Sequence, residues 1–548
     1  MDSSSGDTAA DVTQCYLAVD TRQLRSDDEL RRIFGGGLAA GAARQRGTRQ
    51  HLRSRGGVLV RAKDSWPPYT GGAGLSMTTS GSVFCYTRST AWHAAQAEYS
   101  ICVNSGDPHR LLDMLRKTPY HVGALLQMSE LRAHTNDAAE SAELLERALY
   151  ALEIAWHPSF AGALRSGTAR MDGSLPENAP FFDALFRHIN LLGRKGCVRT
   201  ALECCKLLLS LDVKDPKGIL QCIDYYALRA DEHTWLLRFG PSYRDGSLCS
   251  LPSTAYSLAL AAWSAHKHKA SEEYGDAADA RLRDAMLLHP LALVRLVRNL
   301  SASNALSIDA EWSVVLDSPP FLGADAGGSS TLTHLTDLFV ERHHALWRPE
   351  AVQSWMKACA KAVVRDSSAH ADWALLRQQA YPQDVGVNAY SHLMVSNFSD
   401  AAVRALPPED NPFLRPPQRE LEPDMNLLVD LLAHLPADQQ EELQALAQGA
   451  AGGAGVERNA LRLFLETMFR PQAGGGAGQA AEGAEGILRE PGDSDDERDT
   501  DWLHDGDHGA ESDEDSFEEV PADWRAEWLD AMREGRPAQQ QPDWDTPD

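Results

Sequence analysis

The residues best suited to chemistry in this sequence are basic side chains near the amino terminus. Seven cations fall within twenty residues that contain no Asp or Glu: Arg44, Arg46, Arg49, Arg53, Arg55, Arg61 and Lys63. Guanidinium groups form paired hydrogen bonds with phosphate and carboxylate, so this arginine island could bind RNA phosphates or an acidic protein surface. The alternative is a segment that is solvated, or paired internally with the chain's own acidic end. The charge pattern leaves both interpretations open.

Aromatic residues and prolines follow the island directly in the segment KDSWPPY. Trp66 and Pro67 of this segment are candidate partner-binding residues, because Trp is a frequent anchor at interfaces. The other interpretation is that Trp66, Tyr69, Phe84 and Tyr86 pack an irregular entry segment onto a helical body. Residues 83–87 could form a brief strand within that segment.

No catalytic or metal-binding pattern is visible in the sequence. The glycine runs lack the strand, lysine and hydroxyl of a phosphate-binding loop, and neither G-x-S-x-G nor H-E-x-x-H occurs. The pairs His343-His344 and His266/His268 lack ligand partners at suitable spacing and are predicted to be surface histidines. The nine cysteines include no CxxC pair and are predicted to be buried thiols of a reducing compartment. The sequence therefore predicts a protein that is not an enzyme and has no cofactor.

Charge and hydropathy exclude two further classes of protein. The formal net charge is -26, which argues against nonspecific nucleic-acid binding by the whole surface. No run of about 18 apolar residues occurs, and the acidic, polar amino terminus does not resemble a signal peptide. The sequence predicts no membrane association and a location in the cytosol or the nucleus.

The positioning elements are predicted to be helical hairpins. Residues 118–160 contain two amphipathic helices on either side of the polar turn His134–Asp137. The second helix aligns with two later stretches, each ending near a proline. The aligned apolar positions are Leu145, Ala148 and Leu149; Cys205, Leu208 and Leu209; and Leu282, Ala285 and Met286. A fourth, weaker pair contains Tyr226 and Trp235. This spacing predicts an all-α fold, an irregular α-solenoid of tetratricopeptide-like hairpins.

The expected organisation has seven parts. They are a disordered amino terminus (1–26), an arginine-rich arm (27–63), an aromatic and Gly/Pro-rich entry segment (64–107), the helical repeat domain (108–400), a proline-rich connector (401–423), carboxy-terminal helices (424–470) and an acidic disordered tail (471–548). Residues 491–520 hold fourteen acidic residues against the single cation Arg498, and such self-repulsion favours disorder. Within the tail, the segment 522–534 places Trp524 and Trp528 on one helical face, which is typical of a docking peptide.

Several motifs together resemble a known family. KDSWPPY, GLSM, SGDP, TPYHVGALLQMSE, LLERALYALEIAWHPSF, the stretch from PENAPFF to LLLSLD, and IDYYALRA occur in order between residues 25 and 300. They resemble the ribosome quality control complex subunit 1 family, also called transcription factor 25 or nuclear localized protein 1. Looser likeness continues to about residue 435.

The resemblance implies a function, which helix periodicity alone does not indicate. It implies a non-enzymatic adaptor of the ribosome quality control complex on the large ribosomal subunit. There it would help the ribosome-associated RING ubiquitin ligase build proteasome-directing ubiquitin chains on stalled nascent polypeptides, for extraction by the AAA-type unfoldase of the pathway. The family names also imply the alternative of a nuclear transcriptional co-regulator, a repressor that acts through protein contacts. The resemblance carries over no catalytic residues.

Overall fold

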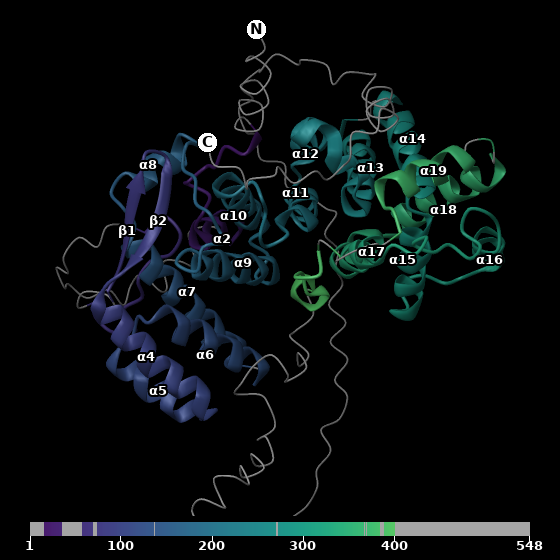
Figure 1. Ribbon diagram of the computed structural model, residues 1–548. Helices are drawn as coiled ribbons and strands as arrows, with labels where there is room; N and C mark the ends of the chain where they lie inside the picture. Colours follow the sequence, from purple (N-terminus) through teal and green to yellow (C-terminus); the bar gives the residue numbers. More distant parts are fainter. Residues whose placement is uncertain are drawn as a thin grey trace, which may run out of the picture. The chain divides into compact units, whose positions relative to one another are not determined.

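The computed structural model describes residues 16–34, 57–69, 74–135, 137–269, 272–366, 368, 370–383, 388 and 390–399. The described part is mostly helical, as predicted (Figure 1). Its amino-terminal elements are α2 (Ser26–Phe34), β1 (Leu75–Ser80), β2 (Val83–Arg88), α4 (Thr90–Ser105), α5 (Pro108–Lys117), α6 (Val122–His134), α7 (Ala138–Ile154), α8 (Phe160–Arg165), α9 (Ala179–Arg194) and α10 (Val198–Leu211).

The remaining elements continue the helical series. They are η1 (Ile219–Gln221), α11 (Ile223–Arg229), α12 (His233–Ser242), η2 (Tyr243–Ser250), α13 (Pro252–Lys269), α14 (Glu272–Leu288), α15 (Pro290–Ala302), α16 (Ala310–Leu316), α17 (Ser330–His343), η3 (His344–Trp347), α18 (Glu350–Arg365), α19 (His370–Ala380) and η4 (Val395–Phe398). Among the described residues no helix is both long and apolar enough to cross a membrane.

The predicted hairpins are present. Consecutive helices pack as α6 with α7, α9 with α10, α11 with α12 and α13 with α14, and α7 packs on α9 so that one pair continues into the next. The nine aligned apolar positions of the three stronger pairs are all buried. The helix pairs differ from one another in length, so they pack as an irregular solenoid (Figure 1).

Local signals explain the bounds of the first hairpin. The His121 side chain precedes α6, and its Nδ1 accepts a hydrogen bond from the Ala124 amide at 3.1 Å. Asp137 precedes α7 and accepts from the Glu140 amide at 3.0 Å. Both side chains satisfy an amide that has no partner within its own helix, and that is why a polar residue marks each helix start.

The entry segment contains a β-hairpin where one brief strand was predicted. β2 matches the predicted strand and pairs antiparallel with β1, joined by a turn at Gly81 (φ +64°). The Tyr86 hydroxyl donates to the Leu152 carbonyl at 3.2 Å and accepts from Trp156 Nε1 at 3.0 Å. The prediction that Trp66, Phe84 and Tyr86 pack onto the helical body is confirmed, since all three are buried.

Two predictions need correction. Residues 16–26 were assigned to a disordered amino terminus, but Leu17 and Leu24 are buried against the helical body. The composition of this segment is polar overall, so it gives no sign that two widely spaced leucines are buried. His343 was predicted to lie on the surface, but it is 0% exposed, because α17 packs on its neighbours on more than one side.

Other predictions lie outside the described residues. These are the first fifteen residues, most of the arginine island, the proline-rich connector, the carboxy-terminal helices and the acidic tail with its segment 522–534.

Candidate functional site

Buried glutamates tie the amino-terminal segment 16–34 to the helical body. The Glu29 carboxylate accepts hydrogen bonds from the amides of Arg199 at 3.0 Å and Thr200 at 2.8 Å. These amides belong to the first turn of α10, where a carboxylate is favoured by the helix dipole. Glu203 then accepts from the Asp20 amide at 2.9 Å. Phe34 is therefore the last residue of a helix, α2, that is fixed in place.

The segment 57–69 is held in the same way on α7. Glu153 accepts from the amides of Val58, Leu59 and Val60, the last two at 3.1 and 3.3 Å. Burial raises the pKa of Glu153, although the three amides oppose this shift. The two docked segments fix both ends of residues 35–56, which contain five arginines of the island.

Lys63, the last cation of the island, forms an ion pair with another residue of the same chain. Its Nζ lies 2.7 Å from Glu146 Oε2, and Lys195 Nζ lies 2.8 Å from Glu146 Oε1. Burial alone would raise the pKa of Glu146, but the two lysines outweigh it and the pKa is lowered. The internal-pairing interpretation therefore holds for Lys63.

We expect Glu146→Gln to destabilise the fold in a pH-dependent way. A carboxyl group whose pKa is lowered by folding contributes stability above its unfolded pKa of about 4.3, and loses it as the pH falls through the folded value. Both lysines are partly exposed, so we expect a loss of about 1–2 kcal/mol at neutral pH. Urea denaturation of both proteins over a pH series measures it. The two curves should converge at acidic pH, whereas Glu143→Gln on the same helix should change little. A difference that grows in acid would contradict this assignment.

Trp66 and Pro67 lie on the first hairpin. Trp66 is 6% exposed, and its ring centroid lies 5.5 Å from that of Tyr150. The Tyr120 hydroxyl donates to the Pro67 carbonyl. Pro67 also lines a 710 Å³ cleft with Leu144 and Arg147 of α7. A partner-binding role for these two residues stays a prediction. The structure brings them close to Lys63.

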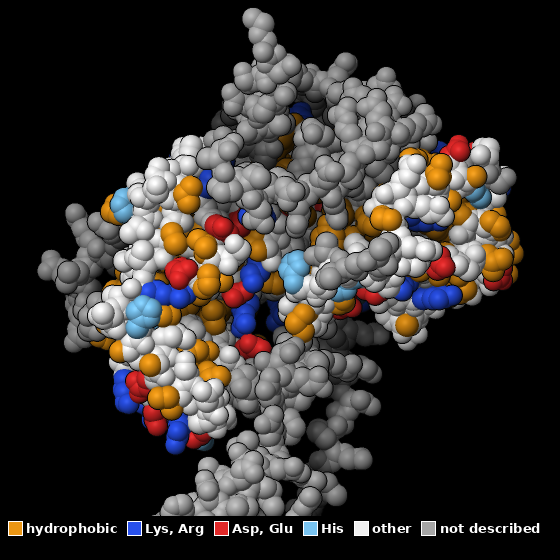
Figure 2. Space-filling view, in the orientation of Figure 1, with side chains coloured by type: hydrophobic (Ala, Val, Ile, Leu, Met, Phe, Trp, Pro, Cys, Tyr) orange, Lys and Arg blue, Asp and Glu red, His pale blue; other side chains and the backbone are white. Residues whose placement is uncertain are grey.

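The other candidate residues are not placed. Arg44, Arg46, Arg49, Arg53, Arg55, Trp524 and Trp528 lie outside the described residues, and their roles stay predictions. On the face shown in Figure 2, basic and acidic side chains of the described residues are interspersed. The described residues on that face show no broad basic surface.

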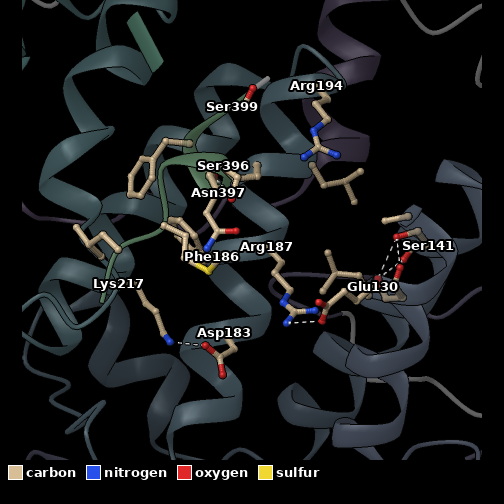
Figure 3. Close-up of a pocket in the computed structure, with 18 of the residues that line it drawn as sticks. Glu130, Ser141, Asp183, Phe186, Arg187, Arg194, Lys217, Ser396, Asn397 and Ser399 are labelled. Atoms are coloured by element: carbon tan, nitrogen blue, oxygen red, sulfur yellow. Dashed lines mark hydrogen bonds and ion pairs between the residues drawn. The ribbon is translucent and has the colours of Figure 1, made fainter. Parts of the chain in front are cut away.

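A second candidate site, a cleft, has no signal in the sequence. A cleft of 680 Å³ lies between α6, α7 and α9 on one side and the strap, residues 390–399, on the other (Figure 3). Arg187 Nη2 and Glu130 Oε2 are 3.3 Å apart on its wall, and Lys217 pairs with Asp183. The strap meets residues up to about two hundred positions earlier in the chain, and no local pattern signals such contacts.

The metal-ligand, thiol and imidazole groups described next are poorly suited to catalysis. No group of three His, Cys, Asp or Glu side chains among them could hold a metal ion. Burial raises the pKa of Cys197 to about 11 and of Cys249 to about 12, so these thiols are poor nucleophiles. Burial lowers the pKa of both His121 and His188 to about 4, which keeps them neutral.

Comparison with known proteins agrees with the resemblance. A family model described as "Transcriptional repressor TCF25" matches residues 84–414, more than half of the chain. The chain belongs to this family. The prediction of family membership is confirmed.

Curated relatives in this family carry ribosome-related names. The human "Ribosome quality control complex subunit TCF25" is 33% identical over 72% of this chain and 59% of its own length. The mouse protein of that name is 30% identical over 82% of this chain and 70% of its own length. "Ribosome quality control complex subunit 1" of Schizosaccharomyces pombe is 36% identical over 48% and 40%. No solved structure matches the chain. These names are regulatory in kind, and none denotes an enzyme.

Proposed function

We propose that this chain is a non-enzymatic adaptor subunit of a ribosome quality control complex. It helps the ribosome-associated RING ubiquitin ligase build proteasome-directing ubiquitin chains on stalled nascent polypeptides, which the AAA-type unfoldase then extracts for degradation. The names of its relatives support the complex. The site of action would be the cytoplasmic large ribosomal subunit.

One observation carries the proposal: the described segments on both sides of residues 35–56 are docked on the helical body. Glu29 fixes the segment before the island, and Glu153 fixes the segment after it. A loop tied at both ends samples fewer positions than a free tail, so its arginines lose less entropy when they bind. The island would thereby hold the adaptor against ribosomal RNA or an acidic protein surface.

The proposed mechanism is proximity and orientation. Trp66, Pro67 and the solenoid would hold the ligase and ubiquitin so that one lysine of ubiquitin faces the growing chain. Correct placement of an acceptor can contribute roughly 7–11 kcal/mol in well-oriented intramolecular reactions, so an adaptor needs no catalytic residue.

The adaptor proposal predicts a change in ubiquitin linkage. In a reconstituted reaction with the ligase and stalled large subunits, adding this protein should raise the share of the proteasome-directing linkage. Mass spectrometry of the chains measures that share. As a control, the protein is added to a RING ligase that does not act on ribosomes. The proposal fails if the linkage distribution on stalled chains is unchanged.

The alternative is a nuclear transcriptional co-regulator with the acidic tail as its contact surface. The family description as a transcriptional repressor favours it. The two functions differ in where a tagged chain accumulates. Chromatin association with nuclear enrichment supports the co-regulator, and a purely cytosolic, ribosome-bound chain counts against it.

A further inference from the structure

The strap is bound to the helical body by an anchor and two backbone contacts. Phe398 is buried, with its ring centroid 5.6 Å from that of Phe186 on α9. Asn190 Nδ2 donates to the Asn397 carbonyl at 3.0 Å, and His334 Nε2 lies 2.8 Å from the Leu393 carbonyl. The helices thus bind this segment as they would bind a peptide, through its carbonyl groups and one aromatic side chain.

The amide of Asn190 is itself held in position. Arg342 Nη2 donates to Asn190 Oδ1 at 2.5 Å, which directs the Asn190 Nδ2 group toward the strap. Leu393 packs against Gly218, whose positive φ of 66° and missing Cβ leave room for the leucine. The surface that receives the strap is therefore preorganised.

The cleft continues beyond the strap toward α6 and α7. Its open wall carries small and apolar side chains, including Ala133, Ala142 and Leu145. The ring nitrogens of His134, also on this wall, are screened from solvent and have no hydrogen-bond partner among the described residues. This open part suits another apolar segment that brings free backbone groups.

We propose that residues 400–414, which directly follow the strap, bind in the open part of this cleft. Ser399 lines the cleft, so the described strap ends at the cleft (Figure 3). The family match also continues to residue 414. Phe413 lies fourteen positions after Ser399, a stretch that spans at most roughly 50 Å, whereas a helix of the length of α9 spans about 24 Å. Phe413 therefore reaches every point of the wall.

The chemistry of this segment fits the wall. Pro407, Pro408 and Pro412 favour an extended backbone whose carbonyls are free to accept hydrogen bonds. His134, Arg187 and Lys217 offer donors on the cleft wall. Phe413 and Leu414 supply apolar side chains for Ala142 and Leu145, as Phe398 does for Phe186. Covalent linkage to the anchored strap raises the effective concentration of the segment to about the millimolar range.

Photocrosslinking in the full-length chain tests the proposal. A benzophenone amino acid replaces Phe413, and mass spectrometry locates the crosslinked peptides after irradiation. We expect crosslinks within one molecule to residues of α6, α7 or α9. The same group in place of Phe464, beyond the proposed segment, is the control and should not crosslink there. Crosslinks only between two copies, or none to the cleft, would overturn the proposal.

A pair of variants on α7 tests the location. Ala142→Trp fills the open cleft, and we expect the crosslink yield from position 413 to fall by about fivefold or more. Ala139→Trp places the same bulk in the other cleft of α7, the one that contains Pro67, and should change the yield by less than about twofold. Circular dichroism of both variants checks that they remain folded. Equal yields from the two variants would overturn the assignment to this cleft.

Discussion

Changing Arg44, Arg46, Arg49, Arg53 and Arg55 together to glutamate is expected to weaken co-sedimentation with large ribosomal subunits by about 100-fold or more at physiological salt. Each arginine that contacts a phosphate releases counterions when it binds, so the loss should depend on salt. We expect the slope of log K against log salt to fall by roughly three to five. Sedimentation of the full-length chain over a salt series measures both quantities.

A charge-matched variant separates local contact from general repulsion. Each Arg→Glu exchange changes the charge by two units, so five exchanges take the formal net charge from -26 to -36. The control changes five exposed arginines of the helical body instead: Arg110, Arg165, Arg238, Arg298 and Arg348. We expect it to bind nearly as well as the unchanged protein. If the island variant binds as the unchanged protein does, the RNA interpretation of the island is wrong.

Replacing Asp224 by Ala is expected to lower the free energy of unfolding by about 3–5 kcal/mol, a large part of a typical total of 5–15 kcal/mol. Asp224 Oδ1 lies 3.1 Å from His343 Nε2 and accepts from the Tyr225 amide at 2.9 Å. The Arg342 guanidinium, 1% exposed, stacks over Tyr225 at 5.0 Å from the ring centroid. Removing the carboxylate leaves buried polar groups without compensation.

Urea denaturation measures this loss. Asp183→Ala is the matched control, because it breaks a more exposed ion pair with Lys217, and we expect it to change stability by only about 0–1 kcal/mol. Asp224→Asn retains the shape and should fall between the two. Equal denaturation midpoints for Asp224→Ala and Asp183→Ala would show that the buried Asp224 carboxylate contributes little to the free energy of unfolding.

The helical hairpins could be predicted because their signals are local. In α7 the apolar residues that form the core recur within one helix, and Asp137 marks its start. The same applies to most of the buried cysteines, which lie on the apolar faces of predicted helices. The strand β1 was missed because its outer face is exposed and polar, and only its pairing with β2 defines it.

The candidate site was predicted only in part, because some of its signals are local and others depend on distant segments. The island and KDSWPPY are visible as composition, and ordered motifs between residues 25 and 300 were enough to recognise the family. The contacts that dock the segments on either side of residues 35–56 are not visible in the sequence, because Glu29 and Thr200 are separated by 171 positions and Glu153 and Leu59 by 94. A glutamate that caps a distant helix is indistinguishable in the sequence from a solvated one.

The sequence by itself determined the helical class, the repeat units and the family, since helix periodicity and motif order are properties of neighbouring residues. Only the tertiary structure decided which polar groups are buried. It placed Glu146 between two lysines and His343 beside Asp224, and it bound the strap against α9. The physical reason is that burial and pairing depend on segments that meet after long loops close, and the periodicity of one segment carries no information about the partner it will meet.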